Sequence, residues 1–139
     1  MLSALFSFRV SAQYQINGDA NQISCNCYQL TQDVGWSGGS VWNVNQIDVN
    51  TSFNYNFEIF LGCDEWGADG IGFVLQPVNV NQGGGSSSLG YGGIAPSLIV
   101  EIDTWPNDQT MSDPAEDHIA IMQNGTADHG SANNLADVK

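Results

Sequence analysis

Carboxylates are concentrated between residues 101 and 118, and no Lys or Arg lies among them. Apolar and β-branched residues predict a strand over Leu98–Thr104, because a Pro-Asn-Asp turn follows it. Side chains alternate along a strand, so Glu101 and Asp103 share one face, about 7 Å apart. Like charges this close resist joint ionisation unless a cation lies between them. The segment therefore predicts a hard-metal site with oxygen ligands, with His118 as a nitrogen ligand for a second, softer ion.

An acidic turn is commonly only a solvated loop, and the order of residue types argues against that alternative here. The segment reads Glu-x-Asp-x-Trp-x-Asn from residue 101 to 107, then Asp-Pro at 113–114 and His-Ile-x-Ile at 118–121. This order resembles the metal-binding segment of the legume lectins and their bacterial relatives, the L-type lectin domain family.

The resemblance implies a two-metal site. It gives Glu101 and His118 to a transition metal, usually manganese, and it makes Asp103 and Asp113 bridges between that ion and a calcium. The backbone carbonyl of Trp105 and the side chain of Asn107 then bind calcium, and Asn107 also binds the sugar. The implied metal ligands are thus Glu101, Asp103, Trp105, Asn107, Asp113 and His118.

Two further segments gain a carbohydrate-binding role from the resemblance. Asp69 follows Gly67-Ala68 and precedes an apolar run; Asp-Gly is a common turn pair, but in the family this Asp binds sugar, often after a cis peptide. Residues 82–93 have the composition of a flexible linker, whereas the family has a Gly-rich loop here whose backbone amide donates to the sugar. Gly84 or Gly85 is the predicted donor, and Tyr91 either stacks on a sugar face or packs in the core.

The charge balance excludes some partners. The net charge is -13, and Arg9 and Lys139 are the only basic Lys or Arg residues. Nucleic acid and anionic membrane surfaces would be repelled, since binding to them depends on Lys and Arg. No apolar run reaches 18 residues, so no spanning helix is predicted. The acidity suits calcium and neutral ligands such as glycans.

Abundant Gly, Asn and Ser and the scarcity of helix-forming runs predict a loop-rich all-β protein. Strands are expected at Cys27–Thr31 and Ser40–Trp42, and the clearest at Phe53–Leu61, where apolar residues recur with period two. The resemblance, over about Gln22 to Val138, implies an antiparallel β-sandwich, the concanavalin A-like jelly roll. Because the family's sandwich has further strands, we expect a partial domain at 13–139, with its C-terminal strands missing.

Residues 1–12 are apolar and end Val-Ser-Ala, which favours a signal-peptide remnant over a first strand. Export would favour a disulfide from Cys63 to Cys25 or Cys27, leaving one free thiol. The neighbours of His129 predict exposure, and the sequence assigns it no role.

Three functions are compatible with these features. The favoured one is calcium-dependent glycan binding by a secreted or cell-surface lectin-like domain, without catalysis. The alternative is a structural or adhesive subunit of an extracellular fibre, a homo-oligomer or filament built on the lectin scaffold. A glycoside hydrolase of the same jelly-roll architecture is less favoured, because Trp105 and Pro106 stand where the second catalytic Glu should fall.

Overall fold

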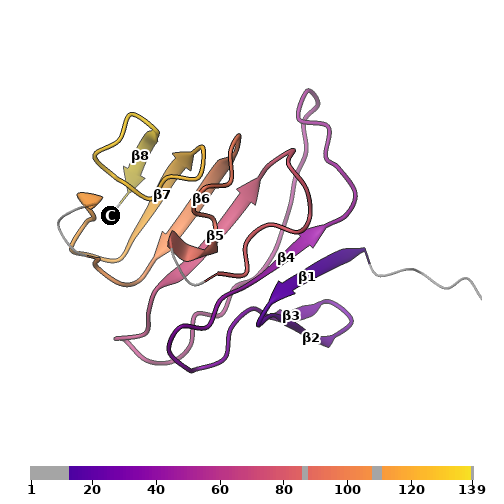
Figure 1. Cartoon of the computed structure of the whole chain (residues 1–139), viewed down its shortest axis with the longest axis horizontal. Helices are drawn as coiled ribbons and strands as arrows, with labels where there is room; N and C mark the ends of the chain where they lie inside the picture. The colour runs from indigo at the N-terminus through magenta and orange to yellow at the C-terminus, as the bar shows by residue number, and fades with distance from the viewer. Residues whose placement is uncertain (1–12, 86–87, 108–110, 139) are drawn as a thin grey trace, which may run out of the picture.

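The computed structural model describes residues 13–85, 88–107 and 111–138, so the predicted signal remnant at 1–12 lies outside the described part (Figure 1). All of the described strand pairings are antiparallel, and the helical residues in the described part are confined to short 3₁₀ turns, so the fold is all-β. No helix in the described ranges is long and apolar enough to cross a membrane. The elements in chain order are β1 Tyr14–Gly18, β2 Asn21–Ser24, β3 Cys27–Gln29, β4 Gly39–Asn43, β5 Gly70–Leu75, η1 Ser88–Gly90, β6 Leu98–Asp103, β7 His118–Gln123 and β8 Asn134–Val138.

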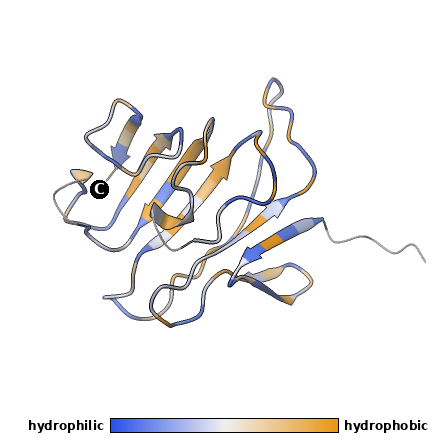
Figure 2. Cartoon of the chain, viewed as in Figure 1, coloured by the Kyte–Doolittle hydropathy of each residue, from blue (hydrophilic) through white to orange (hydrophobic). Residues whose placement is uncertain are grey.

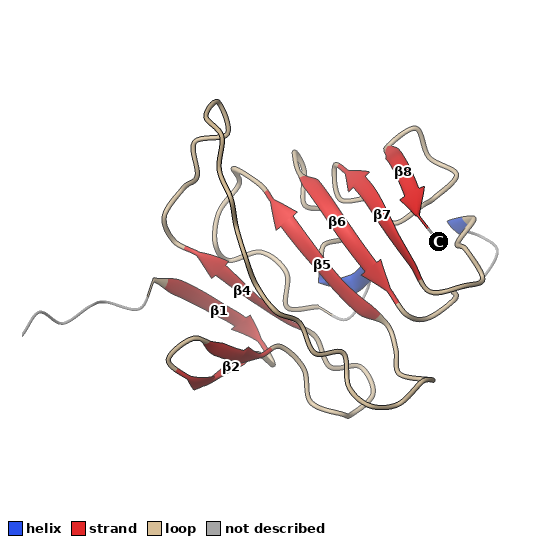
Figure 3. Ribbon diagram, turned by 180° about the vertical axis from the view of Figure 1, so that it is seen from behind, coloured by secondary structure: helices blue, strands red, loops and turns tan. Residues whose placement is uncertain are grey.

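The strands form one larger sheet and two small ones. The larger sheet has the order β5-β6-β7-β8, while β1 pairs with β4 and β2 pairs with β3. The two-stranded sheet of β1 and β4 lies beside β5, as the two opposite views of the molecule show (Figures 1 and 3). The strand predicted over Leu98–Thr104 is confirmed as β6, and those predicted at Cys27–Thr31 and Ser40–Trp42 as β3 and β4 with shifted ends.

Burial alternates along β6 and β7, as it must when one face of a sheet is covered by loops. The hydrophobic core on the covered face is small, and the largest side chains in it are those of Tyr91, Ile99 and Met122. Figure 2 shows that hydrophobic residues are concentrated on β5, β6 and β7. Polar residues share the covered face with this core, and they are Glu101, Asp103 and His118.

The prediction of a strand at Phe53–Leu61 is wrong. The segment is an extended loop between β4 and β5, and no described strand pairs with it (Figure 3). Its alternation still has a packing consequence, because the rings of Tyr55 and Phe57 both pack against Phe73 of β5, with centroids 5.8 Å and 5.2 Å away. Period-two alternation predicts which side chains face inward, but a strand also requires a backbone partner.

The predicted disulfide is also not formed. Cys25 and Cys27 lie on the β2–β3 hairpin and Cys63 lies in the loop before β5, and all three are exposed free thiols. For a disulfide to form, two of these cysteines would have to approach until their Cα atoms lie within about 7 Å and their Cβ atoms face each other.

Candidate metal centre and binding site

The register of the larger sheet lines up the acidic residues with a histidine. Asp103 of β6 lies directly opposite Gly70 of β5 and His118 of β7. In the next row of this face, Glu101 lies between Gly72 of β5 and Ala120 of β7. Directly opposed residues share a face with Cβ atoms about 4.5–5.5 Å apart, so pairing alone brings these polar side chains together.

Glu101 is a buried carboxylate with one oxygen left without a hydrogen bond. The residue is 1% exposed, and the Tyr91 hydroxyl donates to its Oε1 over 2.9 Å. Its Oε2 is buried and accepts no hydrogen bond from the described residues. Burial raises the pKa of Glu101, although the Tyr91 hydrogen bond opposes the shift. An ionised carboxylate in this position needs a positive partner at Oε2.

Asp103 and Asp113 form the second part of the cluster. Asp103 is 4% exposed, and the Trp105 N–H donates to its Oδ1 over 2.8 Å. Burial raises its pKa, the Trp105 N–H lowers it, and the neighbouring charge of Asp113 raises it. The Asp113 side chain is 3% exposed, and its Oδ2 accepts a hydrogen bond from the Asn107 N–H.

Both histidines lie at this cluster, although the sequence predicted an exposed His129 without a role. Nε2 of His118 is 3.6 Å from Asp113 Oδ1. Nε2 of His129 is 3.4 Å from the same oxygen and 3.6 Å from Glu101 Oε2, and its side chain is only 3% exposed. His129 lies in the connection between β7 and β8, residues 124–133, so no periodicity in the sequence fixes the direction of its side chain.

These groups fit a divalent cation. Donor atoms of Glu101, His118 and His129 lie within 4.8 Å of one another, and so do those of Asp103, Asp113 and His118. The only Lys and Arg residues of the chain, Arg9 and Lys139, lie outside the described part, so no described ammonium or guanidinium group neutralises the carboxylates. Buried charges in proteins are paired or coordinate metals.

The predicted calcium ligands after β6 are arranged around the same carboxylates. The Asn107 side-chain Nδ2 is 3.2 Å from the Trp105 carbonyl oxygen. Rotation of this amide by 180° exchanges Nδ2 and Oδ1, which would turn two oxygen atoms toward one point, as calcium requires. The residues that follow Asn107, 108–110, lie outside the described part.

Asp69 immediately precedes β5 at the same end of the sheet. The Ala68–Asp69 peptide is cis, and the Thr104 N–H donates to the Asp69 carbonyl over 3.0 Å. Gly70 pairs with Asp103, and the charge of Asp69 contributes to the raised pKa of Asp103, after burial and the nearer groups. The structure therefore brings Asp69 next to the acidic cluster.

Two of the other predicted sugar-binding residues, Gly84 and Tyr91, pack against the rest of the fold. Gly84 packs against Gly18 at the end of β1, and a Cβ on Gly18 would lie 2.6 Å from the Gly84 carbonyl oxygen. Gly85 has open space where a side chain would be. Tyr91 is 1% exposed, so no ring face is open to a sugar, and the core alternative is the one that its burial supports.

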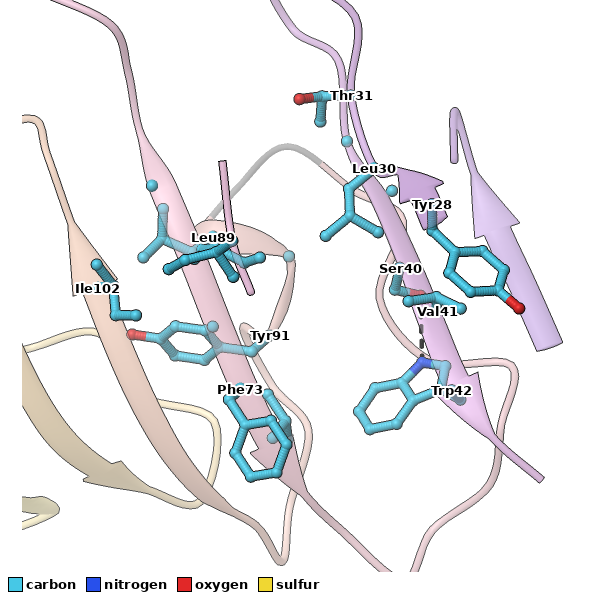
Figure 4. A pocket seen from close by; sticks show the side chains of 18 of the residues that line it. Tyr28, Leu30, Thr31, Ser40, Val41, Trp42, Phe73, Leu89, Tyr91 and Ile102 are labelled. Carbon is cyan, nitrogen blue, oxygen red and sulfur yellow. Dashed lines mark hydrogen bonds between the residues drawn. The ribbon is translucent and has the colours of Figure 1, made fainter. Parts of the chain in front are cut away.

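A large hollow of the described structure lies away from these carboxylates. It lies between β4 and β5, with Trp42 on one side and Phe73 and Leu89 on the other (Figure 4). The Trp42 indole donates to Ser40 Oγ and to the Gln82 carbonyl. Asp69 lies on its border, but Glu101, Asp103 and His118 do not line it. Because the candidate metal ligands do not line this hollow, we place the candidate site at the acidic cluster.

Two similar proteins are much longer than this chain. Pesticidal crystal protein Cry22Aa of Bacillus thuringiensis is 30% identical over 99 residues, which cover 68% of this chain and 13% of that protein. The serine-rich adhesin for platelets of Staphylococcus aureus is 31% identical over 86 residues, which cover 58% of this chain and 4% of that protein.

A family match extends over more of the chain than either of these proteins. The legume lectin β-barrel domain matches residues 7–139, a range that includes β1 to β8 and the whole acidic cluster. The antiparallel all-β architecture agrees with this match. The chain therefore belongs to the legume lectin β-barrel, or L-type lectin, domain family.

Proposed function

We propose that this domain binds glycans in a calcium-dependent manner, without covalent chemistry. The observation that carries the proposal is the meeting of Asp69, Asn107 and the buried carboxylates at one end of β5 and β6. Family membership supports carbohydrate binding in general. The calcium requirement rests on the residues themselves, since a cation would allow Asp103 and Asp113 to ionise together.

In this proposal the metal ions organise the sugar-binding groups. Asp103, Asp113, Asn107 and the Trp105 carbonyl would hold a calcium ion, and this ligation would fix the Asn107 side chain beside the turn that carries Asp69. The Asp69 carboxylate then accepts hydrogen bonds from sugar hydroxyls, and the Asn107 amide donates one. A transition metal at Glu101 and His118 stabilises the same strands.

Two further contacts complete the proposed pocket. A backbone amide of Gly84 or Gly85 is the additional donor to the sugar, and Gly85, open on its side-chain side, is the better placed of the two. Trp105, 39% exposed and two residues from Asn107, offers an aromatic face to the ring. Trp105 and Pro106 stand where the second catalytic Glu of a glycoside hydrolase would fall, which supports binding without hydrolysis.

The test is a glycan array probed with the full chain in calcium and in chelator. We expect binding in calcium only, and we expect Asp69→Ala and Asn107→Ala each to abolish it without changing the far-ultraviolet circular dichroism spectrum. Asp33→Ala is the matched control, because it removes one exposed carboxylate far along the chain from the site. Retention of full binding by both site variants would refute the proposed pocket.

The alternative, an adhesive or structural subunit at the cell surface or in a fibre, is favoured by a different observation. The face of the larger sheet opposite the acidic cluster is apolar and exposed at Leu98, Ile119 and Ile121. One of the similar proteins is named as an adhesin, which suits a secreted or surface location. A melting temperature indifferent to chelator, together with filaments in negative-stain images, would support this alternative over the lectin.

A further inference from the structure

Building on the metal centre of the proposed function, we propose that His129 is a direct ligand of the transition metal and that Asp137 orients it. The ion would then be held by the Nε2 atoms of His118 and His129 together with carboxylate oxygens of Glu101 and Asp113. Two imidazoles change which metal the site selects, from manganese to a zinc-like ion.

The hydrogen bonds of the two imidazoles assign their tautomers. His118 Nδ1 lies 3.0 Å from the Glu116 carbonyl oxygen, which only accepts, so this nitrogen carries the proton. His129 Nδ1 lies 2.9 Å from Asp137 Oδ1, and a carboxylate likewise accepts. When a ring is neutral, its proton is therefore on Nδ1 and its lone pair is on Nε2.

The two lone pairs face each other and two carboxylate oxygens. Nε2 of His118 and Nε2 of His129 are 3.3 Å apart. The oxygens are Asp113 Oδ1, at 3.6 Å and 3.4 Å from the two nitrogens, and Glu101 Oε2, at 3.6 Å from His129. When both rings are neutral, these four atoms are Lewis bases with no proton between them, and they repel one another unless a cation lies at their centre.

The spacing has the size of a metal coordination shell. Ligand atoms 2.0–2.1 Å from a tetrahedral zinc ion lie about 3.3 Å from each other. Four of the six separations among these atoms are 3.3–3.6 Å, and the Glu101 and His118 donor atoms lie within 4.8 Å of each other, so the Glu101 carboxylate would have to move inward to complete a shell around an ion. The unpartnered Glu101 Oε2, in a residue that is 1% exposed, is aimed into this space.

The sheet makes room for His129 and holds Asp137 behind it. Glu101, Ala120 and Asp137 lie in one row across β6, β7 and β8. His129 contacts both ends of this row, so its ring spans the small side chain of Ala120. The His129 ring and the Asn134 amide each approach a carboxylate oxygen of Asp137 to 2.9 Å, so Asp137 is held in place behind the ring. A carboxylate behind a metal-bound imidazole fixes the ring orientation and strengthens the ligand.

The ligand set favours borderline metals. Imidazole suits zinc, copper, nickel and cobalt, whereas carboxylate and water ligands suit manganese, magnesium and calcium. A second imidazole in place of an oxygen ligand therefore shifts the site toward zinc. The neighbouring site at Asp103, Trp105 and Asn107 keeps oxygen donors and remains suited to calcium.

The experiment uses the full chain stripped of metal and titrated with Zn²⁺, Co²⁺ and Ca²⁺ separately, by calorimetry and by the visible absorption of Co²⁺. His129→Ala should lower the Zn²⁺ and Co²⁺ affinities by about a hundredfold, and Asp137→Asn by 10–100-fold, the usual effect of losing a carboxylate behind a metal-bound imidazole. Calcium affinity should stay within about threefold in both variants. Asp117→Asn, an exposed carboxylate beside His118, is the control and should change the Zn²⁺ affinity by less than about threefold.

Pulsed electron paramagnetic resonance of the Cu²⁺-loaded wild-type chain gives a second measurement that needs no variant to fold. We expect couplings from two imidazole nitrogens, reduced to one in His129→Ala. A single coupled imidazole in the wild type, or an unchanged Zn²⁺ affinity in His129→Ala, would overturn the assignment. Loss of the proposed glycan binding has a separate signature, because it would leave the two-imidazole spectrum intact.

Discussion

The two faces of the β5–β8 sheet both depart from what a solvated sheet usually presents, because the covered face buries charged groups beside its hydrophobic core and the open face exposes apolar residues. On the face covered by loops, Glu101, Asp103 and His118 are each less than 5% exposed. On the other face, Leu98, Ile119 and Ile121 are 42%, 44% and 39% exposed. Charged residues are almost never fully buried unless they are paired, and large apolar patches are rarely left open.

Each face therefore indicates a partner. On the covered face, polar groups from several loops contact one another. Tyr91 and His129 contact Glu101, and His129 also contacts Asp113. What these groups require is positive charge, which a divalent ion supplies. The open face has only the extended loop over Phe73 as a described cover, and what it requires is apolar contact.

Adjacent residues of β7 provide the sharpest comparison of the two faces. Met122 is fully buried and Ile121 points to the opposite face, where it is 39% exposed. We expect Met122→Ala to lower the free energy of unfolding by about 2–5 kcal/mol, because it leaves a core cavity. Ile121→Ala should cost less than about 1 kcal/mol, because part of the side chain already contacts water. Urea titrations of the two variants measure both values.

An equally large loss of unfolding free energy in Ile121→Ala and Met122→Ala would contradict the proposed difference between the two faces. It would mean that the open face is covered in solution, and a concentration-dependent melting temperature would then identify a second copy as the cover. Equal and small costs would instead show that the core beneath the acidic cluster is not well packed.

A smaller effect is expected in the loop over the open face. The Tyr55 and Tyr14 hydroxyls are 3.2 Å apart, and this hydrogen bond, with burial as the second cause, raises the pKa of Tyr55 to about 12. A pKa raised on folding stabilises the protein below the ordinary value of about 10, and this stabilisation is lost as the pH rises through about 12. Tyr55→Phe should cost less than about 1 kcal/mol at neutral pH. It should also remove the component near pH 12 from the tyrosinate absorbance titration, and persistence of that component would refute the assignment.

The sequence predicted local features better than those that depend on distant partners. Strand β6 and the shared face of Glu101 and Asp103 follow from alternation within one short segment. The Phe53–Leu61 alternation is equally clear, yet hydrogen bonding to another strand is not encoded in the segment itself. Of the alternating face, only Tyr55 and Phe57 are seen to pack on Phe73, and the whole face is 38–50% exposed and not buried in a core.

The candidate site shows the same limit. Six metal ligands could be predicted from one stretch of sequence. Strand register brings Asp103 next to His118, and the donor atoms of Asp103, Asp113 and His118 lie within 4.8 Å of one another. His129 comes from a loop beyond β7, and its position depends on the chain reversal and on Asp137 of β8. Tyr91 could not be assigned between core and surface, because that choice depends on the gap that Gly72 leaves for its ring.

The most direct test is an anomalous-scattering crystal structure of the full chain grown with Ca²⁺ and Zn²⁺. The account predicts a calcium ion bound by Asp103, Asp113, Asn107 and the Trp105 carbonyl, and beside it a zinc peak bound by Glu101, Asp113, His118 and His129. Saturating metals with no ion at either place, and the Glu101, Asp103 and Asp113 carboxylates turned apart around ordinary water, would contradict it.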